Sequence, residues 1–426
     1  GGGAVLSLRA AIDVEATLQK KLPDAQVVMH QDAGNLAEVL AELWGHVCTL
    51  IREGKARSIV ASFPNVKALG SAMATTRLMG HLDVCKDVCD SFGTDIIVIV
   101  HTLGDGVSPG FEVKRLRDAP EGDGWDDWDD DDDWTGSEMM AKYKDILNDS
   151  EPTEDEKQFA RLVAVPKDDK EVLMKTRDWV NVIISDMGIC PFSQSADKAG
   201  LPVGGVHYPV SRVTSCEECY EVYWREVNYL ISSKEKEVST TLLIVPDFSI
   251  QNVEAFTSFT DTLTHPLEPL GIEKLIQLVY FHPQWVFRDG ADRMGDQSAA
   301  NFARRSPFPM INILRTKQVR LAQKSIPTGL VYTQNEETLS EVGVEDLQRM
   351  LIERDWKQLA ETRVDRRYNK LGKIAQMLMD TDGTPPEEVK AALDQQIADL
   401  EAQREESRRS PSPPPGAGGV PSGERF

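Results

Sequence analysis

The amino-acid sequence alternates short apolar runs with longer segments of helical periodicity, and it does so in two separate regions. Residues 1–117 hold such a series at 25–30 (strand), 35–54 (helix), 58–63 (strand), 66–92 (helix) and 95–103 (strand). Residues 167–330 hold another, at 169–187 (helix), 205–211 (strand), 216–232 (helix), 240–245 (strand), 252–265 (helix) and 275–281 (strand). Strand–helix–strand order is typical of crossover connections, so we predict an α/β fold with two α/β units.

The two units also match in sequence, which predicts that they are related and that the first is a degenerate copy. One Trp and three apolar residues match without a gap: Trp44, Val47, Leu50 and Ile51 against Trp224, Val227, Leu230 and Ile231. The remaining landmarks are a strand-ending proline and two histidines in each unit: Pro64, His101 and His30 against Pro246, His282 and His207. The alternative is that any two crossover units share such spacing. If the copy is real, it would pack like one subunit of a pseudo-symmetric dimer.

The segments outside the two units have biased compositions. Residues 118–166 include the run GDGWDDWDDDDDW at 122–134, and such dense like charge predicts an exposed acidic linker. Its tryptophans leave open a docking peptide for a basic protein partner, or a weak divalent-cation site. We predict a charged helical region at 338–407 and a disordered tail at 408–426.

Charge and cysteine content exclude several classes of protein. The 47 Lys and Arg against 69 Asp and Glu give a net charge of −22, which argues against nucleic-acid binding. No apolar run approaches the ~20 residues that cross a membrane, so we expect a soluble protein without a membrane partner. Six cysteines are too few for a disulfide scaffold, which favours an intracellular, reducing compartment such as the cytoplasm or an organelle matrix. The chain begins GGGAVL without Met, so we expect a processed or incomplete N-terminus.

Residues 278–315 combine more reactive groups and backbone breaks than any other stretch, so we predict that they form one wall of a pocket. Cys190, which follows a predicted helix, is a candidate nucleophile. His282 could serve as its general base, and Arg304 or Arg305 could lower the thiol pKa. The alternative is a buried structural Cys and a His bonded to the backbone.

The segment RRSPFP predicts a helix start, with Ser306 as cap and Pro307 in the first turn. The predicted buried face consists of Met310, Ile313, Leu314 and Leu321. A helix N-terminus favours anions, and Arg305 and Arg315 would strengthen a carboxylate or phosphate site there. The alternative is that these arginines pair with the protein's own carboxylates.

Motifs for metals and common cofactors are weak or missing. Cys216 and Cys219 form one CxxC without a second pair nearby in the sequence, and a structural zinc site usually needs four ligands. A redox role for Cys216 in the first turn of a helix is a minor alternative. Cys85 and Cys89 favour core packing. His207, His282 and Asp289 have no tight metal-ligand spacing, and no Walker loop, GxGxxG or GxSxG motif occurs. We therefore predict no metal and leave the cofactor unknown.

Five motifs, taken in order, resemble the bacterial domain-of-unknown-function family 1415 over residues 172–322. They are CPF (190–192), HYPVS (207–211), TTLLIVP (240–246), FHPQWVF (281–287) and NxxxRSPFP (301–309), followed by Leu314-Arg315. The resemblance implies a compact α/β domain with Cys190, His282, Asn301, Arg305 and Arg315 as site candidates, but it implies no reaction. The sequence departs from the family pattern, which usually has Arg at His207, Asn at Arg304 and His at Asn312. The last departure argues against any mechanism that needs two imidazoles there.

Three functions follow as hypotheses. The first is a hydrolase or transferase acting on a small anionic metabolite, with Cys190 and His282 catalytic and the substrate held by His207, Asn301, Arg304, Arg305, Ser306 and Arg315. The second is a non-catalytic module that binds phosphate or carboxylate through the same arginines. The third is an interaction or assembly protein that uses the acidic linker and the charged helices.

Overall fold

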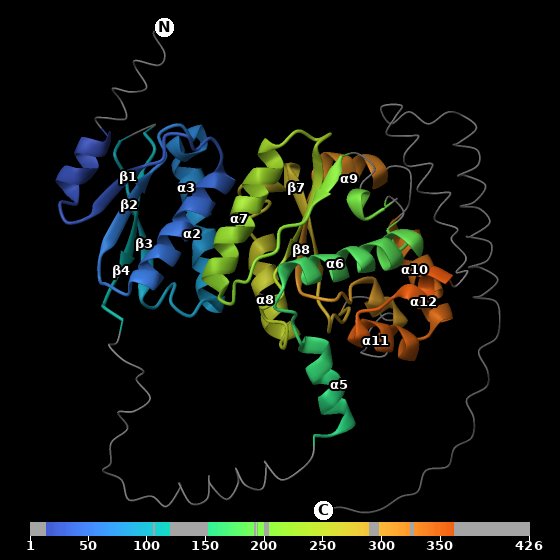
Figure 1. The fold of residues 1–426 in the computed structure, drawn as a ribbon. Coiled ribbons are helices and arrows are strands. Elements are labelled where there is room, and N and C mark those ends of the chain that lie inside the picture. Colours follow the sequence, from blue (N-terminus) through green and yellow to red (C-terminus); the bar gives the residue numbers. More distant parts are fainter. Residues whose placement is uncertain are drawn as a thin grey trace, which may run out of the picture. The chain divides into compact units, whose positions relative to one another are not determined.

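Two four-stranded mixed sheets with the same strand order organise the computed structural model of this protein (Figure 1). The structure describes residues 14–104, 107–119, 152–190, 193, 195–199, 204–288, 298–323 and 328–361. The predicted acidic run at 122–134, the segment 362–407 and the predicted tail at 408–426 lie outside these residues. Within the described part of the chain, no helix is both long and apolar enough to cross a lipid bilayer.

The first sheet has the order β1-β2-β4-β3, in which β1 and β2 are parallel and the other neighbours antiparallel. Its strands are β1 (Gln26–Met29), β2 (Ser58–Ser62), β3 (Ile96–His101) and β4 (Gly110–Arg115). Its helices are α2 (Leu36–Glu53) and α3 (Ala72–Cys85), with short 3-10 turns at Lys67–Gly70 and Lys86–Val88. The side chain of Asn35 caps the start of α2, and Gly54 ends the helix with a left-handed φ of 65°.

The second sheet has the order β5-β6-β8-β7, with the same parallel and antiparallel pairs. Its strands are β5 (Gly205–His207), β6 (Val238–Ile244), β7 (Ile276–Phe281) and β8 (Met310–Arg315). Its helices are α7 (Cys216–Ser232) and α8 (Val253–Thr264). Ser215 caps α7 by accepting the amide of Glu218, as the sequence predicted, and Asn252 caps α8.

Helices α2 and α7 pack against each other and join the two units (Figure 1). Asn35, at the start of α2, donates to Asn228 near the end of α7, and Trp44 stacks on Tyr220 at a centroid distance of 4.4 Å. The helices are therefore antiparallel. Trp44, Tyr220 and Trp224 are fully buried in one apolar core that includes residues of both sheets. Burial of this size makes the two units one folded body rather than two independent domains.

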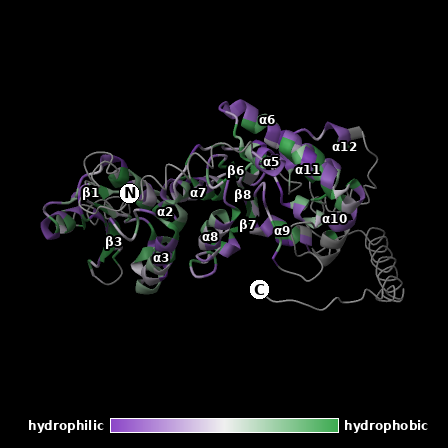
Figure 2. Cartoon of the chain, turned by 90° about the horizontal axis from the view of Figure 1, so that it is seen from below, coloured by the Kyte–Doolittle hydropathy of each residue, from purple (hydrophilic) through white to green (hydrophobic). Residues whose placement is uncertain are grey.

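A second core covers the other face of the second sheet. Helix α6 (Asp169–Trp179) continues into π-helical turns at Val180–Asp186 and packs there with three C-terminal helices, α10 (Thr328–Val342), α11 (Val344–Glu353) and α12 (Lys357–Glu361). Purple and green stretches alternate along α6 and α11 in Figure 2, as expected for helices with one buried face. The remaining elements are α5 (Glu154–Val163), α9 (Thr316–Gln323) and 3-10 turns at Ala196–Lys198, Ile272–Lys274 and Ala299–Ala303.

The strand registers put the two sheets in one common frame. Ser62 and Ile244, which end β2 and β6, each pair with the first residue of the fourth strand. Two residues further on, Pro64 and Pro246 therefore correspond, as the sequence match predicted. The shared order and register agree with that match, although common ancestry of the units stays a prediction.

The histidines do not correspond in this frame. Strands β3 and β7 have equal length and equal register, yet His101 is the last residue of β3 and His282 lies one residue beyond β7. The amide of His30 bonds to the end of β2, whereas the equivalent bond to β6 comes from Ser211 and not from His207. Because a shift of one residue along a strand reverses the face, matching residue types at similar spacing did not identify equivalent sites.

The predicted helix start at Pro307 is wrong. Residues Met310–Arg315 form β8, a central strand between β6 and β7, and the next helix begins only at Thr316. The apolar residues of β8 fit a helical spacing by coincidence. Their near-continuous run is what a strand buried on both faces requires. The helix start expected at Pro307 is therefore absent, and the predicted anion site loses that positive helix end.

Two further elements differ from the sequence prediction. Strand β4 (Gly110–Arg115), which occupies the position of β8 in the first sheet, was not predicted. The predicted long helix at 66–92 is shorter, because α3 covers only Ala72–Cys85. Helix α5 lies inside the segment 118–166 that was predicted as a linker, and a capping box at Thr153 and Glu156 starts it.

Candidate functional site

Four predicted site residues meet in one corner beyond the end of β7. The amide of His282 donates to the carbonyl of Arg304 at 3.2 Å, and the carbonyl of Asn301 accepts from the amides of Arg304 and Arg305, both at 2.8 Å. The Asn301 side chain is fully buried and accepts from the amide of Phe287 at 2.9 Å. These bonds fold the corner onto itself, so the sequence correctly placed these residues in one neighbourhood.

The imidazole of His282 is buried, and both of its nitrogens are hydrogen bonded. Nε2 donates to the carbonyl of Ser249 at 3.0 Å, and Nδ1 accepts from the amide of Gln284 at 3.1 Å. The ring also lies 5.2 Å from that of Phe256, and burial lowers the pKa of His282 to about 4. A neutral ring whose lone pair already accepts an N–H is poorly suited to act as a general base in this conformation.

The two neighbouring arginines are directed at the protein itself. The guanidinium of Arg304 lies 5.4 Å from the ring centroid of Phe281, and that of Arg305 lies 4.9 Å from Phe302. Arg305 Nε also donates to the carbonyl of Trp285 at 3.1 Å. These contacts favour a structural role for both side chains over the capture of an anion.

Ser306 and Cys190 lie in different parts of the second core. Ser306 is fully buried, and its hydroxyl donates to the carbonyl of Phe308 at 2.6 Å. Cys190 is half-buried, its amide donates to the carbonyl of Ile184, and its carbonyl accepts from the amide of Ser193. A nucleophilic role for Cys190 with His282 as base stays a prediction, and the bonds of His282 weigh against it.

Arg315 lies at the far end of β8 and closes the C-terminus of α7. Its Nη2 donates to the carbonyls of Leu230 at 2.6 Å and Ser233 at 2.8 Å, and its Nε donates to Val238 at 3.0 Å. Arg115, at the same position of β4, donates to the carbonyl of Leu50 at 3.1 Å in the same way. Because the last carbonyls of a helix have no partner within it, these bonds assign Arg315 a capping function.

His207 forms a carboxyl–imidazole pair with a residue that the sequence did not single out. Its Nε2 lies 3.2 Å from Oε2 of Glu226 on α7, and its ring lies 4.7 Å from that of Tyr229. The Glu226 Oε2 atom is buried and has no hydrogen-bond partner among the described residues, so the contact with His207 has ion-pair distance without hydrogen-bond geometry. No sequence signal identified Glu226, because it lies two residues after Trp224 and so not on the same face of α7, and its partner His207 lies on another element.

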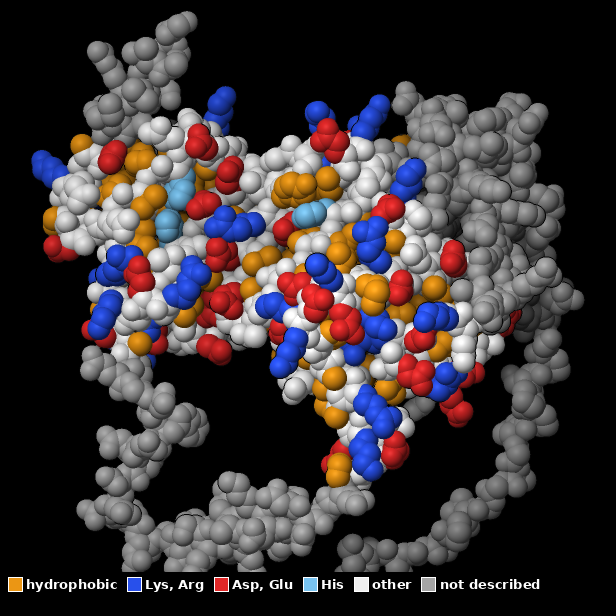
Figure 3. Space-filling model, in the orientation of Figure 1, with side chains coloured by type: hydrophobic (Ala, Val, Ile, Leu, Met, Phe, Trp, Pro, Cys, Tyr) orange, Lys and Arg blue, Asp and Glu red, His pale blue; other side chains and the backbone are white. Residues whose placement is uncertain are grey.

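The electrostatics of this pair suit proton exchange. Burial raises the pKa of Glu226 to about 7 and lowers that of His207 below its usual value. The His207 side chain is 36% exposed and that of Glu226 is 17% exposed, so the imidazole is the more solvent-accessible member of the pair. Figure 3 shows pale-blue histidine side chains on one face of the molecule, with acidic and basic side chains beside them.

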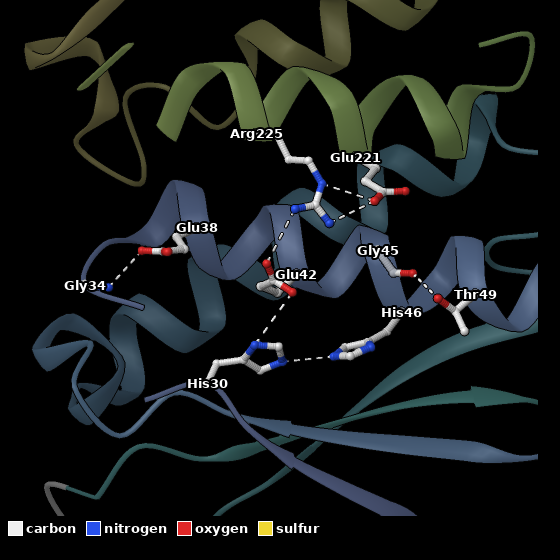
Figure 4. A network of polar contacts seen from close by, with 9 residues as sticks. All are labelled: His30, Gly34, Glu38, Glu42, Gly45, His46, Thr49, Glu221 and Arg225. Carbon is white, nitrogen blue, oxygen red and sulfur yellow. Dashed lines mark hydrogen bonds and ion pairs between the residues drawn. The ribbon is translucent and has the colours of Figure 1, made fainter. Parts of the chain in front are cut away.

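A second histidine cluster lies on the first unit (Figure 4). His30, which follows β1, contacts His46 of α2 through their Nε2 atoms at 3.0 Å. Glu42 lies 3.6 Å from His30 Nδ1 and 3.7 Å from Arg225 Nη1 of α7, and Arg225 also bonds to Glu221 at 2.9 Å. In the sequence, His30 was noted only as a matching position of the two units, and its spacing to His46 did not predict this contact.

The cysteines of the CxxC motif are protonated and shielded. Cys216 is the first residue of α7, and burial, followed by nearby Glu217 and Asp90, raises its pKa to about 12. Cys219 is fully buried and its pKa is also raised. Redox thiols need a lowered pKa, so the redox alternative gains no support. No group of three or more His, Cys, Asp or Glu side chains in the described part of the chain is arranged to hold a metal ion.

Residues 171–349 match the family model described as Protein of unknown function (DUF1415). We refer to this matched stretch as the DUF1415 segment. It covers less than half of the 426 residues and contains the second sheet with α7 and α8, so the resemblance expected over 172–322 is confirmed and extends further. No curated protein matches the chain, and no solved structure matches it. The His207–Glu226 pair lies within the DUF1415 segment, whereas the His30–His46 pair lies outside it.

Proposed function

We propose that the DUF1415 segment is an enzyme that moves protons by general acid–base catalysis, with His207 and Glu226 as the catalytic pair. The observation that supports this proposal is the contact of a solvent-reachable imidazole, at 3.2 Å, with a buried carboxyl oxygen that lacks a hydrogen bond. Carboxyl and imidazole groups with shifted pKa values, held together at a surface, are typical of catalytic sites. The substrate class is a small molecule that reaches the exposed edge of the His207 ring.

In this mechanism His207 takes a proton from water or from a substrate hydroxyl, and the Glu226 carboxylate stabilises the imidazolium that forms. In the second half of the cycle the imidazolium gives this proton to the leaving group of the substrate, which restores neutral His207. The two groups titrate as a coupled pair, so the pH dependence of the rate belongs to the pair and not to either residue alone. Tyr229, which is 45% exposed and adjacent to the imidazole, offers an aromatic surface for the substrate.

The proposal moves the site away from the corner at the end of β7. There the polar side-chain atoms of His282, Arg304 and Arg305 bond to backbone carbonyls and to a backbone amide, and the two guanidinium groups also contact aromatic rings. Hydrolysis remains the first reaction type to test, because it needs only water as nucleophile and a base near neutral pKa. A covalent route through Cys190 would need a rearrangement that frees a nitrogen of His282.

The test is a panel of chromogenic esters, thioesters and phosphoesters, assayed with wild type, His207→Gln and Glu226→Gln. General acid–base groups contribute roughly 10²–10⁴-fold, so either variant should lower the rate on an accepted substrate by about 100-fold or more. Glu221→Gln is the matched control on the same helix, because Glu221 pairs with Arg225 and its rate should match wild type. Equal rates for wild type and both variants would overturn the proposal.

A second measurement tests the catalytic pair without a substrate. The side-chain carboxyl of Glu226 can be followed by carbon NMR as the pH is raised from 4 to 9. We expect a midpoint near pH 7 in wild type and a changed midpoint in His207→Gln, because the two groups are coupled. A midpoint at the value of an exposed Glu would remove the physical basis for the catalytic pair.

A further inference from the structure

The contact between His30 and His46 has the geometry of a direct hydrogen bond. The Nε2 atoms are 3.0 Å apart and the ring centroids 5.2 Å, so the centroid distance exceeds the nitrogen distance by nearly two ring radii. The two nitrogens therefore point at each other almost end on. A metal ion placed on the line between them would need a nitrogen separation of about 4 Å, because metal–nitrogen bonds are about 2.0–2.1 Å long. The geometry points to one shared N–H and not to a metal.

The neighbouring carboxylate determines which ring donates. Oε2 of Glu42 lies 3.6 Å from Nδ1 of His30, and a negative charge there favours a proton on Nδ1. Nε2 of His30 is then the acceptor, and His46 Nε2–H is the donor. This arrangement requires at least one ring to keep an unprotonated Nε2, so the contact tolerates one added proton but not two.

The charged groups around the pair come from both packed helices (Figure 4). On α2, Glu38 and Glu42 favour the charged form of His30, although burial has the larger effect and lowers its pKa. Burial lowers the pKa of His46 to about 4, with smaller contributions from His30 and from Arg225 of α7. Arg225 is in turn shared between Glu42 and Glu221, the other charged residue of α7 at this site.

We propose that the His30–His46 pair is an acid-operated latch, which holds the loop after β1 on helix α2 and opens when both rings bind a proton. Two N–H groups facing each other at 3.0 Å repel, so the rings must separate. His30 also stacks on fully buried Phe63 at 4.9 Å, and its departure would expose that ring. The pH window lies below the ordinary His value of 6.5, since both folded pKa values are lowered.

The position of the latch links it to the joint between the two units. The loop that follows His30 leads to Asn35, which caps α2 and donates to Asn228 of α7 at 2.8 Å. A charged His30 would also attract Glu42 and so weaken its ion pair with Arg225, in which Nη1 of Arg225 lies 3.7 Å from Oε1 of Glu42. Opening would therefore loosen two polar contacts between α2 and α7, while the apolar core keeps the units together.

Hydrogen exchange of the His30 amide tests the latch, because this amide donates to the carbonyl of Ser62 at 2.9 Å. Exchange of the full chain is measured between pH 7.5 and 4.5 and corrected for the intrinsic pH dependence. Between the ordinary His value of 6.5 and the lowered folded pKa values, protection should fall by up to about tenfold per pH unit for each proton bound. His46→Gln keeps an N–H donor without a proton uptake in this range, so its protection should fall less steeply with pH than that of wild type, because only His30 still binds a proton.

Two further variants keep the experiment decisive. His207→Gln, which removes an imidazole outside the pair, should open like wild type, and Glu42→Gln should open at least as far as wild type at each acid pH, because it removes a charge that stabilises protonated His30 in the closed form. Unchanged protection of wild type down to pH 4.5 would overturn the proposal. So would equal opening of wild type and His46→Gln, since a general acid effect would then explain the loss.

Discussion

Replacement of Arg315 by Met separates a structural role from the substrate-binding role that the sequence predicted. Arg315→Met keeps most of the aliphatic volume of the side chain and removes the guanidinium, including the three N–H groups that donate to carbonyls. The carbonyls of Ser233 and Val238 lose their bonds to this side chain, whereas that of Leu230 still accepts from the amide of Ser233 at 3.2 Å. The change therefore tests whether the end of α7 depends on this guanidinium.

The expected loss follows from the number of bonds. Each protein hydrogen bond contributes about 1 kcal/mol net, which gives about 3 kcal/mol for three bonds. Burial lowers the pKa of Arg315, so removal of the charge returns part of that amount, and we expect about 2–3 kcal/mol of destabilisation. Since the entropy of unfolding grows with chain length, a chain of 426 residues should lose about 1–2 °C per kcal/mol, so Tm should fall by roughly 2–6 °C.

Thermal unfolding followed by circular dichroism or calorimetry measures this shift, and two variants calibrate it. Arg115→Met removes the corresponding side chain of the first unit, which makes two bonds, so its effect should be smaller. Arg117→Met removes an exposed guanidinium paired with Asp95 and should change the stability by less than about 1 kcal/mol. An Arg315→Met protein with wild-type Tm would refute the capping argument and return Arg315 to the list of ligand-binding candidates.

Three further predictions concern single residues. His282 has a folded pKa of about 4 against 6.5 in the unfolded chain, so the unfolded state binds more protons below pH 6.5 and the protein loses stability as the pH is lowered from 6.5 towards 4. His282→Asn should reduce the difference in unfolding free energy between pH 7.5 and 5, measured by urea unfolding, by about 2 kcal/mol. Glu217 is buried and accepts two backbone N–H groups of the first unit, at 2.9 and 3.1 Å; Glu217→Gln should lower stability by about 1–3 kcal/mol in the same assay, and no change would contradict a clamping role. Cys190 should react with iodoacetamide no faster than an unfolded thiol at pH 7, and faster labelling would revive the nucleophile hypothesis.

The sequence predicted the first three strands of each sheet and the long helices between them, because their periodicity and end signals are local. Ser215 caps α7 as its position suggested, and Asn35 and Gly54, the ends of the predicted helix at 35–54, cap the two ends of α2. The fourth strand of each sheet was missed. Strand β8 is short and apolar on both faces, so its period does not distinguish a strand from a helix, and Pro307 supplied a false helix start.

The contacts of the candidate site were also only partly predictable from the sequence. The residues near the end of β7 lie in one stretch of the sequence, from His282 to Arg305, which is why they could be grouped before the fold was known. Their partners were not predictable, since Ser249, Gln284 and Trp285 contribute backbone atoms that no side-chain pattern reveals. Glu226 and His46 were missed because their partners, His207 and His30, lie on other elements and meet them only after the fold is made.

The comparison of the two sheets explains why one unit has reactive groups on a face where the other has none. On the outer face of the second sheet, Ile244 and Phe281 are buried under α6 and the C-terminal helices. The equivalent positions of the first sheet hold Ser62 and His101, by the register of the fourth strands. His101 contacts Glu112 at 2.7 Å on this face.

The different residue types at these equivalent positions follow from the layer that packs on each sheet face. In the second sheet the covering layer, with α6 and its π-helical extension, also contains Cys190, so apolar residues beneath it are stabilised by burial. In the described part of the first unit, the corresponding layer is the smaller cluster around Leu18, Ala25 and Val60. A sheet face that is only partly covered needs polar groups that pair with each other, as His101 and Glu112 do. Loss of the covering layer therefore accounts for the polar face of the first unit without any assumption about catalysis.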